Sequence, residues 1–192
     1  MNAATASPKI TPEALLAMPD RKSFELVGGK LVGRKSTSLA SWTAGQLLFQ
    51  LRLSEEGRRR EYLFGPDLGY RCFRDDPDRV RRPDVSYVNA TRLPEGLSDD
   101  YMTIAPDLAV EVLTPDDLAS EVHLKIREYF DAGVRAVWVV DPVVRVAQAF
   151  RAGGGGSWLS EHDRFDGEDV LPGFSCPVSA IFPPRKAVPT GG

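Results

Sequence analysis

Residues 105–142 read APDLAVEVLTPDDLASEVHLKIREYFDAGVRAVWVVDP, and this stretch decides the fold. An apolar run from Leu108 to Leu113 is followed by a helical pattern and then by a second apolar run, Val134 to Val140. Strand, helix and strand in this order predict two parallel neighbouring strands joined by a right-handed crossover. We therefore expect an α/β fold.

Glu111 stands in the middle of the first apolar run, between Val110 and Val112. Strands of a parallel sheet are covered on both faces, so a side chain in mid-run normally points into packed protein. A carboxylate there is unfavourable unless it is hydrogen-bonded, paired with a cation or bound to a metal. Glu111 is therefore either a structural residue that caps a loop or pairs with an arginine, or part of a functional site.

The helical pattern between the two runs places a lysine on its inner face. The apolar positions share the face that should pack on the sheet, namely Leu118, Val122, Ile126 and Tyr129. Lys125 falls inside that stripe, which favours an ion pair with the inward Glu111. The alternative is an exposed pair with Glu121, four residues earlier, which contributes only about 0.2–0.5 kcal/mol.

Composition indicates one ordinary globular domain over residues 1–192, with a core from about 10 to 183 and frayed ends: 42% of residues are hydrophobic and 27% charged. The sequence predicts neither a membrane span nor a signal peptide, and hence a cytoplasmic protein. Cys72 and Cys176 are far apart, as expected for two unpaired thiols in a reducing compartment. Only two histidines are present, which leaves little material for a zinc site or a histidine-based triad.

The charge balance excludes a broad electrostatic footprint for nucleic acid, because the net charge is −3 and the pI about 5.5. Any such binding must be local. Arginines cluster at 58–60 and again at Arg79, Arg81 and Arg82. Each cluster could contact phosphates, or could simply be a solvated surface.

The rest of the chain predicts further elements from local signals. They are a short helix at 11–18 capped by Thr11, a hairpin at 24–32 turning at Gly28-Gly29, a long helix at 38–55, a hairpin at 61–73 closed around Pro66-Asp67, an antiparallel strand at 145–151, a flexible turn at 153–156 and a last helical turn at 178–182.

A second carboxylate of interest is Asp84, which follows Pro83 at the start of a β-rich run. Proline cannot donate to a strand ladder, so a strand should begin at or just after Pro83. Because the Glu111 strand comes about one strand and one loop later, this order allows Asp84 and Glu111 to converge. Two carboxylates and an inward lysine are what a divalent metal and a phosphoryl centre require.

Three motifs together resemble the Uma family of restriction endonucleases, within the PD-(D/E)XK nuclease superfamily. They are RPDV at 82–85, APDLAVEVLTP at 105–115 and WVVDP at 138–142, with Lys125 and Tyr129 between the last two. The resemblance extends from Phe24 to Gly173. It implies a restriction-endonuclease-like mixed central sheet flanked by helices. It also implies hydrolysis of DNA phosphodiester bonds with Mg²⁺ or Mn²⁺ as the cofactor.

The resemblance also assigns roles to residues. It implies Asp84, Glu111 and the backbone carbonyl of Val112 as metal ligands, and Lys125 as the catalytic lysine. Glu25 matches an early glutamate of the family and is an accessory acidic candidate, as is Glu121. Glu25 is equally well explained as a strand residue beside a hairpin.

Two departures from the family pattern keep alternatives open. The superfamily lysine lies two residues after the acidic strand residue, but that position is Leu113 here, so the lysine must come from the following helix. Many family members have a histidine near the start of the long helix, whereas 38–45 contains none. An inactive binding or regulatory module and a small-molecule phosphoesterase are therefore the alternatives to a DNase. A homodimer is compatible with cutting two strands.

Overall fold

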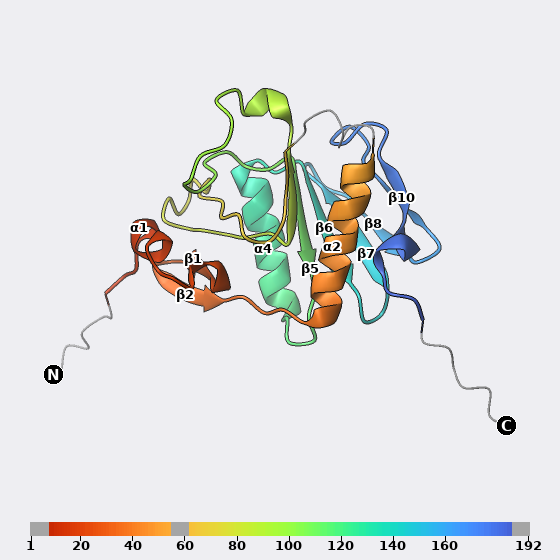
Figure 1. Ribbon diagram of the computed structural model, residues 1–192, viewed down its shortest axis with the longest axis horizontal. Coiled ribbons are helices and arrows are strands. Elements are labelled where there is room, and N and C mark those ends of the chain that lie inside the picture. The colour runs from red at the N-terminus through yellow and green to blue at the C-terminus, as the bar shows by residue number, and fades with distance from the viewer. Residues whose placement is uncertain (1–7, 55–61, 186–192) are drawn as a thin grey trace.

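A six-stranded mixed sheet forms the centre of the protein in the computed structural model, which describes residues 8–54 and 62–185 (Figure 1). Its order is β3-β4-β5-β6-β7-β8, and only β5 and β6 are parallel neighbours. The strands are β3 Tyr62–Phe64, β4 Val85–Val88, β5 Leu108–Val112, β6 Ala136–Asp141, β7 Val146–Arg151 and β8 Gly156–Ser160. The expected α/β class with a mixed sheet is confirmed. The arginines at 58–60 lie outside the described residues, as do the predicted frayed ends beyond 10–183 except for 8–9 and 184–185.

The strand-helix-strand unit at the centre is β5, α4 (Ala119–Ala132) and β6, as the sequence predicts. β5 and β6 pair in parallel with Glu111 opposite Val139. Gly133 ends α4 in the left-handed conformation, with φ +97°. The prediction that Leu118 lies on the inner face of the helix is wrong. The chain turns at 114–117, so Leu118 is the residue just before α4 and its side chain is 59% exposed.

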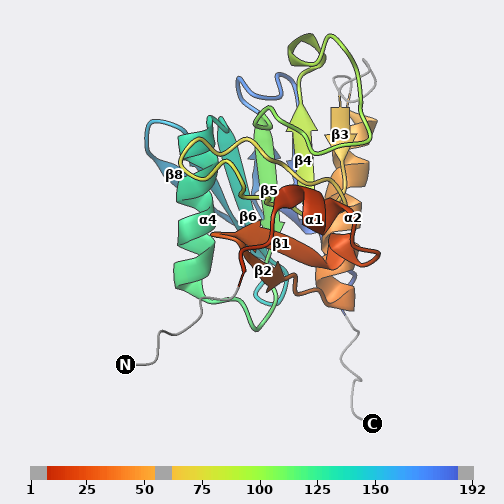
Figure 2. The ribbon, with the colours of Figure 1, turned by 90° about the vertical axis from the view of Figure 1, so that its left-hand side faces the viewer.

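Two helices cover the two faces of the sheet, α4 on one and α2 (Ser38–Leu53) on the other (Figure 2). Side chains alternate along β5, so Val110 packs in the core under α2 while Ala109 packs in the core under α4. Glu111 shares its face with Ala109. The pleat of β5 therefore directs the Glu111 carboxylate toward α4 rather than toward α2.

The N-terminal elements form a small unit of their own, with α1 (Pro12–Leu16), η1 (Arg21–Ser23), β1 (Phe24–Val27) and β2 (Lys30–Gly33). Thr11 caps α1 as predicted, since its Oγ1 accepts a hydrogen bond from the Ala14 N–H. The β1-β2 hairpin is also as predicted, and Gly28 and Gly29 both have positive φ at its turn. This unit lies across the sheet between α4 and α2 in Figure 2.

The predicted hairpin at 61–73 is wrong. β3 pairs with β4 instead, and 68–73 contains only isolated bridges from Tyr70 to Arg81 and to Met102. The physical reason is a long-range anchor: the Tyr70 side chain is fully buried, and its hydroxyl donates to Ser86 Oγ at 2.7 Å. That contact holds the segment against β4, where it cannot fold back on β3.

The C-terminal part closes the core beneath α2. Its elements are β9 (Arg164–Asp166), β10 (Ser175–Pro177) and η3 (Val178–Ile181), and the last was predicted as a helical turn. The 3₁₀ helix η2 (Ala90–Arg92) follows β4. Both cysteines are free, as expected. Within 8–54 and 62–185, no helix has the length and apolar character needed to cross a membrane.

Candidate functional site

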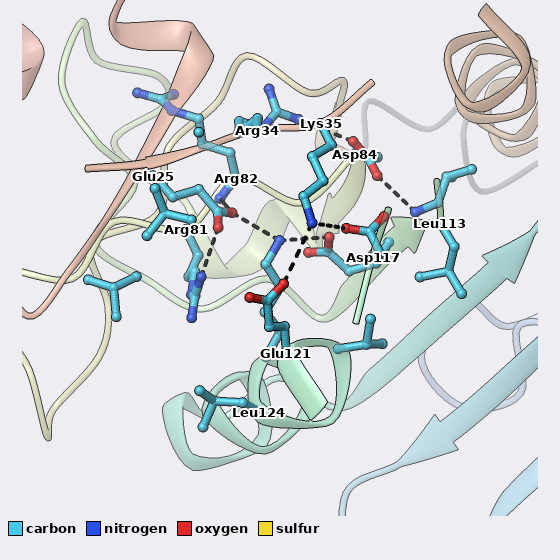
Figure 3. A pocket seen from close by; sticks show the side chains of 17 residues that line it. Glu25, Arg34, Lys35, Arg81, Arg82, Asp84, Leu113, Asp117, Glu121 and Leu124 are labelled. Carbon is cyan, nitrogen blue, oxygen red and sulfur yellow. Dashed lines mark hydrogen bonds and ion pairs between the residues drawn. The ribbon is translucent and has the colours of Figure 1, made fainter. Parts of the chain in front are cut away.

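Figure 3 shows a cavity of about 290 Å³ at the carboxyl end of β5. Glu111 is one of the residues that line it. Its two oxygens have different partners: Tyr129 Oη donates to Oε1 at 2.6 Å, and Lys125 Nζ donates to Oε2 at 3.0 Å. Both partners come from the inner face of α4. The predicted inward pair of Lys125 with Glu111 is therefore present.

Asp84 approaches Glu111 from the neighbouring strand. Val85 is opposite Val110 in the antiparallel β4-β5 register, and the Asp84 N–H donates to the Val110 carbonyl at 2.9 Å, so Asp84 lies beside the carboxyl end of β5. Asp84 Oδ2 accepts a hydrogen bond from the Val112 N–H at 2.8 Å, which holds the carboxylate at the carboxyl end of β5. Asp84 and Glu111 line the same cavity, as their predicted convergence requires.

Glu25 provides a third carboxylate from β1 and is only 2% exposed. Its Oε1 lies 3.2 Å from Lys125 Nζ and accepts the Arg82 N–H at 2.9 Å, and its Oε2 accepts from Arg81 Nη1 at 2.8 Å. Lys125 is therefore held between Glu25 and Glu111. Glu25 is both a structural partner of two arginines and a wall of the cavity.

Burial and mutual repulsion shift the pKa values of these carboxylates. Burial raises the pKa of Glu111 to about 7, against the favourable charge of Lys125 and with a further rise from Asp84. Burial also raises the pKa of Asp84. Burial acts in the same direction on Glu25, but Lys125 and Arg81 outweigh it and lower its pKa.

Burial acts on the pKa of Lys125 in the opposite direction from its effect on the carboxylates. Burial alone would lower its pKa, but the carboxylates of Glu111 and Glu25 outweigh burial and raise it above its ordinary value. The ammonium group therefore keeps its charge at neutral pH. It can donate hydrogen bonds and stabilise negative charge, but it cannot accept a proton.

The donor set fits a hard divalent cation. Two carboxylates whose pKa values are raised by burial face one cavity, and Mg²⁺ or Mn²⁺ prefers such oxygen ligands. Val112 lines the same cavity, with its N–H engaged by Asp84. Among the described residues, no group of three or more His, Cys, Asp or Glu side chains is arranged to enclose a metal. A Mg²⁺ ion with few protein ligands keeps its remaining positions for water and substrate oxygens.

A second cavity, of about 410 Å³, adjoins the first and shares Arg34, Lys35, Asp84 and Val112 with it. Arg34 Nη2 donates to Asp84 Oδ1 at 3.1 Å. Figure 3 shows Lys35 reaching toward Asp117 and Glu121, at 3.6 and 3.7 Å. Glu121, the second accessory candidate, thus pairs with Lys35 at the rim, while Lys125 pairs inside the cavity.

The lining of the first cavity is balanced in charge, neither a positive groove nor an acidic pocket. It contains five acidic and five basic side chains, namely Glu25, Asp84, Glu111, Asp117 and Glu121 with Arg34, Lys35, Arg81, Arg82 and Lys125. Arg34 and Lys35 were not predicted as site residues from the sequence. The signal that could have identified them is the occurrence of two adjacent cations directly after the second strand of the hairpin.

The arginine cluster at 79–82 is not a solvated surface, so that alternative is wrong. Arg79, Arg81 and Arg82 are 8%, 5% and 3% exposed, and their side chains are engaged inside the protein. Arg81 bridges Glu25 and Glu128, with Nη2 2.7 Å from Glu128 Oε2. Glu128 was also missed, although it lies one turn after Lys125 on α4.

Comparison with known proteins agrees with this architecture. A family model for Uma2, described as "Putative restriction endonuclease", matches residues 12–179. A crystal structure from Anabaena variabilis, described as a "putative nuclease belonging to DUF820", superimposes with a TM-score of 0.74 at 19% identity. The superposition covers 90% of this chain and 97% of that one. No match was found among curated proteins. Since the family model covers most of the sequence, including β1, β4, β5 and α4, this chain belongs to the Uma2 family.

Proposed function

We propose that this chain is an endonuclease that hydrolyses DNA phosphodiester bonds with Mg²⁺ or Mn²⁺. The observation that carries the proposal is the convergence of Asp84 and Glu111 on one cavity that also holds the buried Lys125. The family description and the nuclease-like fold support the same reaction. Two free thiols suit the reducing cytoplasm as its compartment.

The proposed metal ligands are Asp84, Glu111 and the carbonyl of Val112. A divalent ion bound there would polarise the phosphate and lower the pKa of a coordinated water, which supplies the nucleophile at neutral pH. The protein contributes fixed positions for the carboxylates. Val112 holds Asp84 through its N–H, and Tyr129 holds Glu111 through its hydroxyl.

Lys125 is proposed as the residue that stabilises charge on the phosphate. Its raised pKa keeps it as an ammonium ion, so its role is to donate hydrogen bonds and not to act as a base. Contacts to Glu25 and Glu111 fix its position before substrate arrives. Arg34 and Lys35, where the two cavities meet, are candidates for contacts to flanking phosphates.

The decisive experiment compares the wild type with Glu111→Gln, which keeps the size of the side chain but removes its charge. Calorimetry measures Mg²⁺ binding. In the same samples, nicking of supercoiled plasmid measures activity. We expect the variant to lose metal binding and at least about a hundredfold in nicking rate, since one ligand and the orientation of Lys125 are both lost. Glu168→Gln is the control, because Glu168 pairs with Arg151 on β7 and is half-exposed. Equal nicking by Glu111→Gln and wild type would refute the site.

A small-molecule phosphoesterase is the second candidate, and the balanced charge of the cavity favours it. A volume of about 290 Å³ is close to that of small-ligand pockets. Hydrolysis of bis(p-nitrophenyl) phosphate without plasmid nicking would support this candidate over the DNase. Metal binding with turnover of neither substrate would favour an inactive binding module.

A further inference from the structure

The outer side of α2 carries an apolar seam, which we define as Leu39, Trp42, Gln46, Phe49 and Leu53. These residues recur at alternating intervals of three and four, so they form one line along the helix. Trp42 is 49% exposed, Phe49 53% and Leu53 45%. In Figure 1, α2 lies in front of the strands, with one side turned away from them.

The opposite side of α2 is already packed in the core. Ala40, Leu47 and Leu51 are buried against the sheet in the larger hydrophobic cluster. A helix at the surface normally shows charged residues on its outer side, whereas a helix that is apolar all round is buried. Among its 16 residues α2 has one charged side chain, Arg52, and that guanidinium donates to the Leu63 carbonyl. The outer side of α2 therefore combines several large apolar side chains with a single charge, as expected for a helix whose outer side is also covered.

We propose that a second copy of this chain covers the seam through an antiparallel pairing of the two α2 helices. The seam is nearly symmetric about Gln46, with Leu39 and Leu53 seven residues away on either side and the aromatic residues between. A two-fold axis near Gln46 sets Leu39 against Leu53 and Trp42 against Phe49 of the other copy. The Gln46 amides meet at the axis, where each can donate to and accept from the other. Such an interface is isologous.

Size and charge both favour this occupant. The three exposed seam side chains offer on the order of 300 Å² of apolar surface per copy, the centre of a standard patch of roughly 800 Å² per partner. The seam contains no cation to meet a phosphate, which argues against nucleic acid on this face. The second cavity is lined by Ser41 and Gly45 of the same helix, so a dimer would have one cavity on each side of the helix pair. This inference is independent of the proposed nuclease activity.

Sedimentation equilibrium of the full chain tests the proposal. We expect the wild type to reach twice the monomer mass at micromolar concentration, and Trp42→Glu and Phe49→Glu to remain monomeric at concentrations at least a hundredfold higher. Trp158→Glu on β8 is the matched control, since Trp158 is 65% exposed and lies outside the seam, and it should dimerise like the wild type. Circular dichroism checks that each variant is folded.

Disulfide trapping tests the position of the axis. Under mild oxidation, Gln46→Cys should form a covalent dimer, while Trp158→Cys and the wild type, with its buried and half-buried thiols, should not. A wild type that stays monomeric at millimolar concentration would overturn the proposal. So would a wild-type monomer whose DNA binding is lost in Trp42→Glu, because the seam would then be a nucleic-acid face. A dimer that is unaffected by all seam substitutions would place the interface elsewhere and overturn it as well.

Discussion

At the scale of single residues, the site is defined by where charge is buried. Glu111 is 8% exposed and has two donors of different kinds, a neutral hydroxyl and an ammonium. The ammonium is shared with Glu25, so one cation serves two carboxylates while Asp84 has Arg34. Burial raises the pKa of Glu111, repulsion from Asp84 and Glu25 adds to that rise, and a divalent cation bound there would oppose both effects.

The raised pKa of Glu111 predicts a pH-dependent metal affinity. Below about pH 7 the carboxyl group carries a proton that a metal must displace, so Mg²⁺ binding should weaken about tenfold from pH 8 to pH 6 and release about one proton at the lower pH. Calorimetry in buffers of different ionisation enthalpy measures the released protons. The Glu111→Gln variant should bind poorly at both pH values. A wild-type affinity that is the same at pH 6 and pH 8 would contradict this assignment.

The same shift has an effect on stability in the absence of metal. The folded-state pKa of Glu111 lies above its ordinary value of 4.5, so its contribution to stability is complete below about pH 4.5 and is lost as the pH rises to about 7. Glu25 acts in the opposite direction, because its pKa is lowered: its contribution is present above its ordinary pKa and is lost as the pH falls. A divalent metal bound at Glu111 would remove this penalty and should raise the free energy of unfolding most above pH 7.

At the scale of elements, local periodicity was sufficient for the centre of the fold. The β5-α4-β6 unit, the hairpin at Gly28-Gly29 and the inward side of Lys125 follow from spacing within about 40 residues. The helix start was missed because a helical wheel contains no information on where the helix begins. In the structure, Asp117 Oδ2 accepts from both the Thr114 N–H and hydroxyl, and this turn leaves Leu118 outside α4.

Two glycines on the two covering helices should respond to alanine in opposite directions. Gly133 adopts φ +97° at the end of α4, so Gly133→Ala should destabilise the protein by about 1 kcal/mol. Gly45 lies inside α2, where an added Cβ meets no heavy atom within 4 Å, so Gly45→Ala should stabilise it by about 0.5–1 kcal/mol. The midpoint temperature of thermal unfolding should fall by roughly 2–4 °C in Gly133→Ala and rise by a similar amount in Gly45→Ala. Shifts of the same sign would show that one of the helices is misassigned.

At the scale of the whole molecule, the contacts that sequence reasoning missed are the long-range ones. Tyr70 bonds to Ser86, Arg34 to Asp84 and Arg81 to both Glu25 and Glu128, across separations of 16 to 56 residues. Such pairs leave no periodic signal, so the arginines looked like a surface cluster. They in fact tie the N-terminal hairpin to α4 over the cavity. The site therefore depends on three separate parts of the chain, of which local patterns identified the β4-β5 part and α4.

Loss of this tie should affect the entire fold. Arg81 is 5% exposed and bridges two buried carboxylates, so Arg81→Ala leaves Glu25 paired only with Lys125 and Glu128 paired only with Arg79, and should lower the free energy of unfolding by about 3–5 kcal/mol. Lys22→Ala is the control: it removes an exposed pair with Asp67 and should change the same free energy by less than about 1 kcal/mol. Urea unfolding measures both. Adding Glu25→Gln to Arg81→Ala should lower the free energy of unfolding by less than the sum of the single changes, because one of the two buried carboxylates that lost Arg81 is gone. An additive double variant would mean that Arg81 does not couple the hairpin to α4 through Glu25.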